Sequence, residues 1–244
     1  MTRLLVSVQD GHEAEIALNG GADIVDFKDA GKGALGALDP RLIAAALPRL
    51  HERVLTSATA GDWPLDPVAL TQAVMSTGAT GVDYVKIGLL PGADLSGCIM
   101  TLAPAATQYR LVAVFFADRG VPLEALQHLQ IAGFGGAMID TFDKRSGGLR
   151  QHMSDRNLKT FIQAARDCEL CTGLAGSLRA DDIDALIDLA PHLLGFRGAL
   201  CESSDRGAML SVERLRKVRD VLDHARAAHP DIDTTCSLAH KTGH

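Results

Sequence analysis

Residues 4–28 read LLVSVQDGHEAEIALNGGADIVDFK and contain one complete strand–helix–strand pattern. The short apolar run over 4–8 predicts a buried strand. The helical spacing over 12–19 predicts a helix that ends at Gly20-Gly21. The next apolar run, over 22–28, predicts a second strand. This order of elements is typical of parallel sheets whose strands are joined by helices.

The same pattern recurs about eight times along the chain. Further strands are predicted at 54–59, 84–89, 111–117, 137–141, 172–175 and 193–200, and further helices at 40–50, 67–77, 93–102, 123–131, 155–168, 181–189 and 212–228. Eight such units predict an α/β fold of the (β/α)₈ TIM-barrel type. A doubly wound open sheet is the competing fold, but residues 9–13 after the first strand read QDGHE and lack its glycine fingerprint.

The composition predicts one globular domain. Apolar residues make up 47% of the 244 residues and charged residues 22%, which is close to the globular average. No change in composition divides the chain, so we expect residues 1–229 to form a single barrel domain. Periodicity is lost over 230–244, which predicts a disordered C-terminal tail.

Charge and hydropathy restrict the partners. The formal net charge is −6 and only 4% of residues are aromatic, so we expect neither nucleic acid nor an anionic membrane surface as a partner. The N-terminus lacks the pattern of a signal peptide, and no apolar run approaches a membrane span. We therefore expect a cytoplasmic protein, and a homo-oligomer because such barrels commonly assemble.

Charged residues stand at the ends of the even-numbered strands. Asp26 and Lys28 share one face of the second strand, Lys86 lies in the fourth, Asp140 ends the sixth and Lys144 follows it. Alternation along a strand turns the first four toward the barrel interior, where side chains from alternate strands share a layer. Paired lysines and aspartates that merely fill the mouth are the structural alternative. Convergent charges in a cleft are, however, the pattern of functional sites.

Two neighbouring lysines favour one chemistry. A nearby cation and partial burial both destabilise an ammonium group, so one lysine is expected to titrate closer to neutral pH. A neutral lysine amine attacks aldehydes and ketones to form a Schiff base, and an aspartate moves protons at the adjacent carbon. This chemistry requires no metal and no organic cofactor. The nine histidines form no metal-binding motif, and no metal site is predicted.

The last two strands end in residues suited to an anion. Gly176 and Ser177 follow the seventh strand, Arg197 and Gly198 lie in the eighth, and Arg206 follows it. Barrels frequently bind phosphate between these two loops, so we predict a phosphate site here. Tight turns and a surface ion pair at Arg206 are the alternatives. The glycine-rich loop over 31–36 is interpreted as an ordinary mobile turn, with a cover over the site as the other possibility.

Several sequence blocks carry a family resemblance: LLVSV (4–8), GGADIVDFKD (20–29), GALGA (33–37), VKIG (85–88), DT (140–141) with Lys144, GLAGS (173–177) and GFRGALC (195–201). They resemble the (5-formylfuran-3-yl)methyl phosphate synthase family, formerly called 4-(hydroxymethyl)-2-furancarboxaldehyde-phosphate synthase. The resemblance spans about residues 3–222. The chain departs from the family pattern at Asp29-Ala30-Gly31, where Asp-Pro is expected. It also departs at residues 115–118, which are more apolar than usual.

The resemblance implies a (β/α)₈ lyase of methanofuran biosynthesis, as found in methanogens and some methylotrophic bacteria. It would condense two molecules of glyceraldehyde 3-phosphate with loss of phosphate and water. Lys28 matches the family's Schiff-base lysine and Lys86 its second active-site lysine, while Asp26, Asp140 and Lys144 fall in matching blocks. Two other functions stay open: a Schiff-base aldolase for another phosphorylated substrate, and a non-catalytic barrel that binds phosphorylated metabolites.

Overall fold

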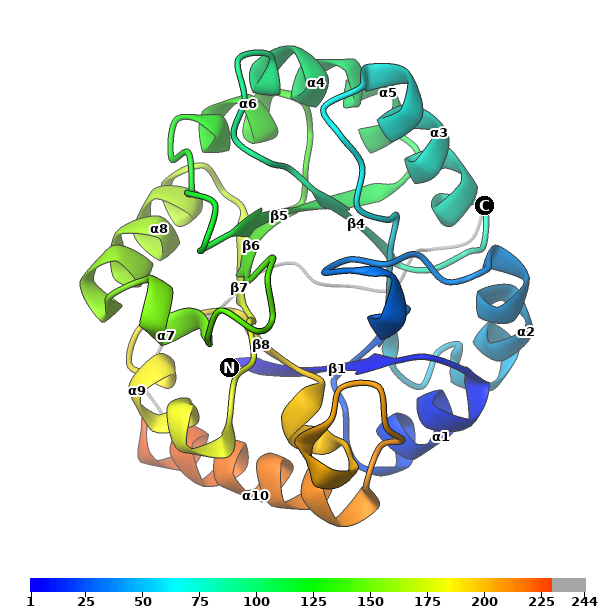
Figure 1. Cartoon of the computed structure of the whole chain (residues 1–244), viewed down its shortest axis with the longest axis vertical. Coiled ribbons are helices and arrows are strands. Elements are labelled where there is room, and N and C mark those ends of the chain that lie inside the picture. Colours follow the sequence, from blue (N-terminus) through cyan, green and yellow to red (C-terminus); the bar gives the residue numbers. More distant parts are fainter. Residues whose placement is uncertain (230–244) are drawn as a thin grey trace.

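The computed structural model describes residues 1–229, so the tail predicted at 230–244 lies outside the described residues. Eight parallel strands follow one another in chain order and close into a barrel, with β1 paired to β8 (Figure 1). They are β1 (Arg3–Val8), β2 (Ile24–Phe27), β3 (Leu55–Thr59), β4 (Tyr84–Gly88), β5 (Arg110–Phe116), β6 (Gly136–Asp140), β7 (Cys171–Leu174) and β8 (Leu193–Phe196). The predicted (β/α)₈ barrel is confirmed.

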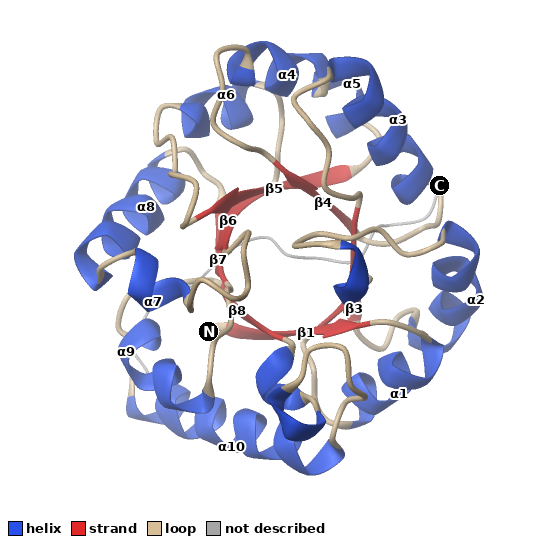
Figure 2. Ribbon diagram, viewed as in Figure 1, coloured by secondary structure: helices blue, strands red, loops and turns tan. Residues whose placement is uncertain are grey.

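Helices surround the barrel as an outer ring (Figure 2). They are α1 (Gly11–Asn19), α2 (Pro40–Leu50), α3 (Pro67–Gly78), α4 (Leu95–Thr101), α5 (Ala103–Ala106), α6 (Ala125–Ile131), α7 (Leu149–His152), α8 (Asp155–Asp167), α9 (Ile183–Ile187) and α10 (Val212–Ala228). Short 3₁₀ turns add η1 (Ala30–Lys32), η2 (Ala180–Asp182), η3 (Gly198–Leu200) and η4 (Glu202–Ser204). Across residues 1–229, no helix has the length and apolar character that crossing a membrane requires.

Local chemistry explains where the longer helices begin. The Asp39 carboxylate accepts the Arg41 N–H at 2.8 Å, and Pro40 occupies the first turn of α2. The Ser211 hydroxyl accepts the Arg214 N–H at the start of α10. An acceptor at the cap and a proline in the first turn are standard signs of a helix start. Both helices therefore begin at the residues that the sequence predicted.

The last strand is shorter than predicted. The expected strand over 193–200 ends at Phe196, because the backbone leaves the extended region at Arg197 (φ −140°, ψ −73°). Residues 198–200 then form η3, and Leu200 is fully buried there. An apolar run shows that a segment is buried, but it does not distinguish a strand from a short helical turn.

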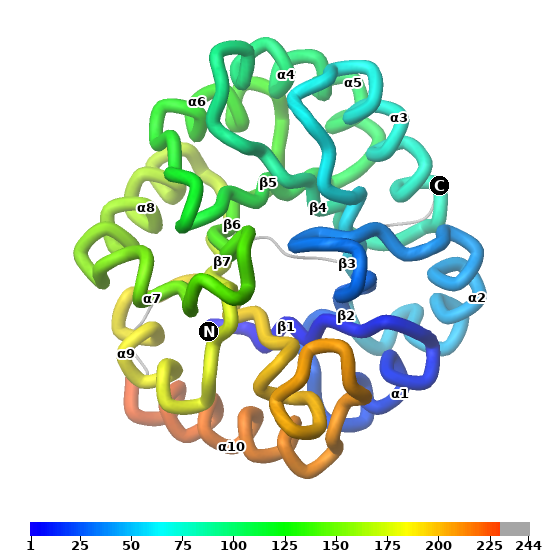
Figure 3. Tube along the Cα trace, viewed as in Figure 1, coloured from blue at the N-terminus to red at the C-terminus, as the bar shows by residue number. Residues whose placement is uncertain are grey.

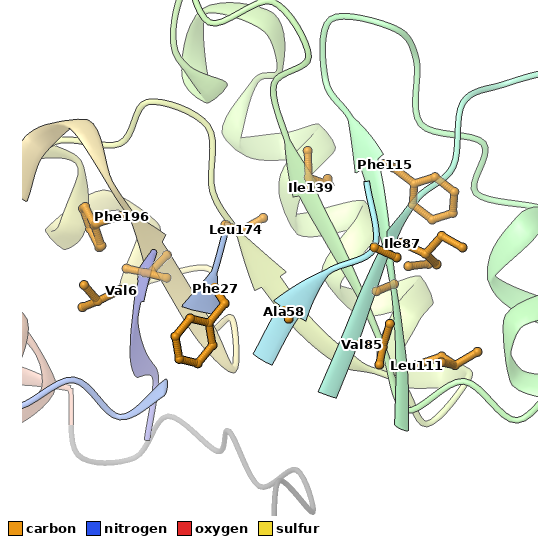
Figure 4. Packing of buried hydrophobic residues seen from close by; sticks show 14 of the residues in the cluster. Val6, Phe27, Ala58, Val85, Ile87, Leu111, Phe115, Ile139, Leu174 and Phe196 are labelled. Carbon is orange, nitrogen blue, oxygen red and sulfur yellow. The ribbon is translucent and has the colours of Figure 1, made fainter. Parts of the chain in front are cut away.

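Side chains alternate between two apolar layers. Val25 of β2 belongs to the outer apolar cluster under the helices. Phe27 of β2 and Phe196 of β8 belong to the same cluster (Figure 4). Ile24 points inward, where it joins the cluster that fills the barrel with Leu5 and other strand residues. Because successive strand residues face opposite sides, Asp26 and Lys28 share the inward direction of Ile24. The predicted alternation is confirmed.

The loop after β2 is packed over the open end of the barrel, as the chain trace shows (Figure 3). Leu35 is 1% exposed and belongs to the inner cluster. Its backbone N–H donates to both carboxylate oxygens of Asp62, at 3.1 and 3.0 Å. The Thr59 hydroxyl donates to the Gly36 carbonyl at 3.0 Å. These contacts make the loop one wall of the mouth, with Leu35 lining the cavity.

Candidate active site

Four charged side chains meet at the carboxyl ends of β2, β4 and β6. Asp26, Lys28, Lys86 and Asp140 are all buried, with 0–6% of each residue exposed. They form two ion pairs, Lys86 with Asp26 and Lys28 with Asp140. Buried charges are costly unless they are paired and hydrogen-bonded. The structure therefore brings together the residues that the strand pattern had grouped, at the end where such barrels hold their active sites.

Asp26 orients Lys86. The Lys86 Nζ donates to Asp26 Oδ2 at 2.7 Å. Two serine hydroxyls also donate hydrogen bonds to the Asp26 carboxylate: Ser7 Oγ donates to Oδ2 at 3.0 Å and Ser57 Oγ donates to Oδ1 at 2.6 Å. Both serines lie level with Asp26 on the neighbouring strands β1 and β3. The three donors fix the carboxylate, and the carboxylate in turn fixes the Lys86 ammonium group.

Lys28 is held less tightly. Its Nζ lies 3.7 Å from Asp140 Oδ2, beyond hydrogen-bond distance. Lys144, from the loop after β6, forms a close ion pair with the other oxygen, Asp140 Oδ1, and lies 3.3 Å from Thr141 Oγ1. The backbone N–H of Thr141 also donates to Asp140 Oδ1, at 2.7 Å. Asp140 is therefore bound mainly by Lys144 and Thr141, which leaves the Lys28 amine available to a ligand.

This arrangement shifts two pKa values. Burial, with help from Lys144 and Lys86, outweighs the attraction of Asp140 and Asp26 and lowers the pKa of Lys28 from 10.5 to about 8. Burial alone would raise the pKa of Asp140, but Lys144 and Lys28 hold it well below its ordinary value. Near neutral pH the site thus combines an ionised carboxylate with a lysine that readily loses its proton.

Lys28, Lys86 and Asp140 line a cavity of about 1090 Å³ at the barrel mouth, and Asp26 lies buried behind Lys86. Ligand pockets typically measure roughly 300–1,000 Å³, so this one has room for two small substrates at once. Four acidic residues line it against nine basic residues, which are Lys28, Lys86, Lys144, Arg145, Arg179, Arg197, Arg206, Arg214 and Lys217. The protein is acidic overall, yet its cavity carries an excess of positive charge and suits anionic ligands.

The loops after β7 and β8 form one side of the cavity. Gly176, Ser177 and Gly198 all line it. Gly176 (φ +112°) and Ser177 (φ +51°) adopt left-handed conformations, and a Cβ at Gly176 would lie 3.1 Å from the Thr141 backbone nitrogen. Glycine therefore lets the β7 loop pass close to the end of β6. The turn carries the Ser177 hydroxyl to the cavity wall, where we predicted a phosphate.

The two predicted arginines are placed differently. Arg206 lines the cavity half-buried, and its Nη2 donates to the Gly33 carbonyl across the mouth at 3.0 Å. Arg197 also borders the cavity, but its guanidinium turns toward α1 and forms a buried ion pair with Glu13. All five of its N–H donors have partners within the protein. The geometry therefore favours Arg206 as the anion contact and gives Arg197 no free donor for a ligand.

Sequence reasoning missed three contributors to this site. Ser7 and Ser57 follow the inward alternation of their strands and hold Asp26. Their position was readable from the two-residue period, but their partner was not. Leu35 lines the cavity from a loop that has no periodic pattern. Over residues 1–229, no three or more His, Cys, Asp or Glu side chains are grouped as a metal ion would require.

The chain matches known proteins over nearly its whole length. The family model described as 4-HFC-P synthase covers residues 4–219. A Methanopyrus kandleri (5-formylfuran-3-yl)methyl phosphate synthase is 35% identical over 90% of this chain and 98% of its own. A Methylorubrum extorquens protein, given the same name provisionally, is 42% identical over 93% of this chain and 89% of its own.

Solved structures support the fold. The crystal structure of phosphoribosyl anthranilate isomerase from Thermotoga maritima has a TM-score of 0.67, with 13% identity over 92% of this chain and 100% of that one. At so low an identity, the likeness concerns the barrel alone. The family assignment rests instead on the sequence matches, which include the strands and loops that build the charged cavity. The chain belongs to the 4-HFC-P synthase family.

Proposed function

We propose that this protein is a lyase that converts two molecules of glyceraldehyde 3-phosphate into (5-formylfuran-3-yl)methyl phosphate. Elemental balance then requires the release of one inorganic phosphate and two molecules of water. The observation that carries the proposal is Lys28, a buried amine whose pKa is lowered to about 8 in a positively charged cavity. Family membership supports this product, and a role in methanofuran biosynthesis is part of the proposal.

Lys28 begins the reaction as a nucleophile. The neutral amine adds to the carbonyl carbon of one triose phosphate, and water leaves as the imine forms. The protonated imine withdraws electrons from C2, so a proton leaves C2 and an enamine results. Phosphate then departs from C3 as hydrogen phosphate, which carries away the proton lost from C2. Asp140 stays ionised because its pKa is low, which suits it to balance the iminium charge better than to accept a proton.

The substitution pattern of the product fixes the new carbon–carbon bond. The formyl group and the phosphomethyl group stand on ring carbons separated by one CH. C3 of the first triose must therefore bond to C2 of the second, which reacts as its 2-keto isomer. Ring closure and loss of two molecules of water complete the furan, and hydrolysis of the imine, which consumes one water, releases its formyl group from Lys28. Lys86, oriented by Asp26, and Lys144, on Asp140, are the cations placed to supply protons to departing oxygens.

The β7 and β8 loops are proposed to hold the retained phosphate. Ser177 offers a hydroxyl, Gly176 and Gly198 permit close backbone approach, and Arg206 adds a charged guanidinium. Charge-assisted hydrogen bonds of this kind are the strong ones in phosphate recognition. Both substrates carry phosphate, which agrees with the excess of basic residues around the cavity.

The test is mass spectrometry of the purified protein incubated with glyceraldehyde 3-phosphate alone. We expect a furan phosphate to appear together with one equivalent of inorganic phosphate, and neither to appear with Lys28→Ala. An unchanged substrate pool from folded protein would contradict the proposal. That result would favour an aldolase for another phosphorylated substrate, or a barrel that only binds such metabolites.

A further inference from the structure

A buried ion pair lies beside the cavity and takes no part in the steps above. Glu13, in the first turn of α1, is 2% exposed. Its carboxylate accepts Arg197 Nη1 at 2.5 Å and Nη2 at 3.1 Å, together with the backbone N–H groups of Gln9 (2.8 Å) and Leu210 (3.1 Å). The pair therefore connects the β1–α1 turn with both ends of the β8–α10 loop.

Arg197 uses its remaining donors on backbone carbonyls. Nη1 donates to Ser7 O at 3.2 Å, Nε donates to Arg206 O at 2.9 Å, and Nη2 donates to Ala208 O at 2.8 Å. The last two carbonyls lie in the part of the β8–α10 loop between η4 and α10, beside the bridge between Cys201 and Leu210. The planar fork of the guanidinium fixes the backbone of this loop at residues 206 and 208.

The backbone held in this way includes residue 206, whose side chain reaches the cavity mouth. Arg206 lines the cavity, and its Nη2 bonds to the Gly33 carbonyl in the loop after β2. It lines the same cavity as Lys28, Asp140 and Lys144. A long, flexible side chain binds an anion well only when its anchor is fixed, since ordering it otherwise costs conformational entropy.

We propose that Glu13 is a positioning residue that acts through Arg197 to hold Arg206 at the cavity mouth for binding of a substrate phosphate. The carboxylate keeps the Arg197 fork in place, the fork holds the Arg206 backbone, and the Arg206 side chain contacts the phosphomonoester. The inference rests on the proposed function in one respect, that the ligand is a phosphate monoester. It is independent of the reaction that follows binding.

Calorimetric titration with glycerol 3-phosphate tests this chain of contacts. This compound has the phosphate but no carbonyl, so it reports binding whether or not the protein makes a furan. We expect Glu13→Gln and Arg206→Ala each to weaken binding about tenfold, the loss typical of one charge-assisted hydrogen bond. The double variant should bind no more weakly than Arg206→Ala alone, because residues that act through one contact are not additive.

Asp23→Asn is the matched control. Asp23 lies just before β2, at the opposite end of the barrel from the cavity. It pairs with Arg219 and Arg226 of α10. Its loss should lower stability without changing the dissociation constant. Wild-type affinity in Glu13→Gln, or an effect that adds fully to that of Arg206→Ala, would overturn the proposal.

A second variant covers the case in which Glu13→Gln does not fold. Arg197→Lys keeps a charge opposite Glu13 but cannot reach both Arg206 O and Ala208 O, so it should reproduce the tenfold loss. The loss should again vanish in the Arg206→Ala background. Binding by Arg197→Lys at wild-type strength would likewise overturn the proposal.

Discussion

At the scale of single residues, Lys28 lies between opposing influences. Burial, Lys144 and Lys86 disfavour its ammonium form, whereas Asp140 and Asp26 favour it. The amine is 3.7 Å from Asp140, while Lys86 makes a 2.7 Å hydrogen bond to Asp26. The two lysines in one cavity are thus prepared differently: Lys28 readily loses its proton, whereas Lys86 is held in place by Asp26. The difference arises from their hydrogen-bond partners.

The pH dependence of imine formation should reveal these influences. An ammonium cannot attack a carbonyl, so the rate should rise with pH through a pKa of about 8 and then level off. Lys144→Met removes a positive neighbour and frees Asp140 for Lys28, so the rising limb should move to higher pH. Asp140→Asn removes the strongest favourable charge and should move it to lower pH. Rates of borohydride trapping across the pH range measure both shifts. If the rising limbs of the two variants moved in the same direction, this explanation of the Lys28 pKa would be wrong.

The sequence predicted the direction of the charged side chains but not their pairing. Alternation along β2, β4 and β6 identified Asp26, Lys28, Lys86 and Asp140 as inward-facing, because a two-residue period is a local property. Which lysine pairs with which aspartate depends on the stagger of strands around the barrel. Stagger is set by long-range pairing, such as Ser7 beside Asp26 and Asp26 beside Ser57.

At the scale of elements, two loops were the least predictable parts of the site. The loop after β2 is held by Asp62, Thr59 and Arg206, residues from other strands or loops. The loop after β8 is held by Arg197, which sequence reasoning assigned to phosphate. The residue type indicated that an arginine could bind an anion. Only the fold shows that the Arg197 guanidinium is already paired with Glu13.

Asp62→Ala tests whether the loop after β2 forms part of the binding site. The change leaves the backbone N–H of the buried Leu35 without its acceptor, at a cost of about 1–3 kcal/mol. We expect the KM for glyceraldehyde 3-phosphate to rise several-fold, because Leu35 and Gly33 border or contact the mouth.

Asp66→Ala is the comparison for this change. Asp66 also accepts backbone N–H groups, those of Val68 and Ala69, but it caps α3 in the outer ring of helices. It should lower the melting temperature to a similar degree and leave KM unchanged. Equal KM values for both variants would show that the loop has no part in binding.

At the scale of the whole molecule, stability and reactivity are opposed at Lys28. The pKa of Lys28 is lower in the folded protein than the ordinary value of 10.5, so folding disfavours its proton. That penalty is complete below about pH 8 and declines as pH rises from there toward 10.5. The barrel tolerates it because the surrounding apolar layers are extensive.

Lys28→Met should therefore stabilise the protein while it abolishes activity. Methionine fills a similar volume without a charge, and Asp140 keeps its partner Lys144. We expect the free energy of unfolding at neutral pH to increase by about 1–3 kcal/mol. Denaturant titration measures this value, and the gain should shrink as the titration is repeated at higher pH. A variant less stable than wild type at neutral pH would show that the ammonium group is well accommodated in the fold.

Peptide mapping after borohydride reduction shows which residue forms the covalent intermediate, and we expect it to be Lys28. The protein is incubated with glyceraldehyde 3-phosphate, reduced and digested, and the site of the added mass is located by tandem mass spectrometry. A substrate-derived adduct should appear on Lys28 and be absent from Lys28→Ala. An adduct on Lys86 or Lys144 instead, or no adduct from protein that turns over its substrate, would contradict this expectation.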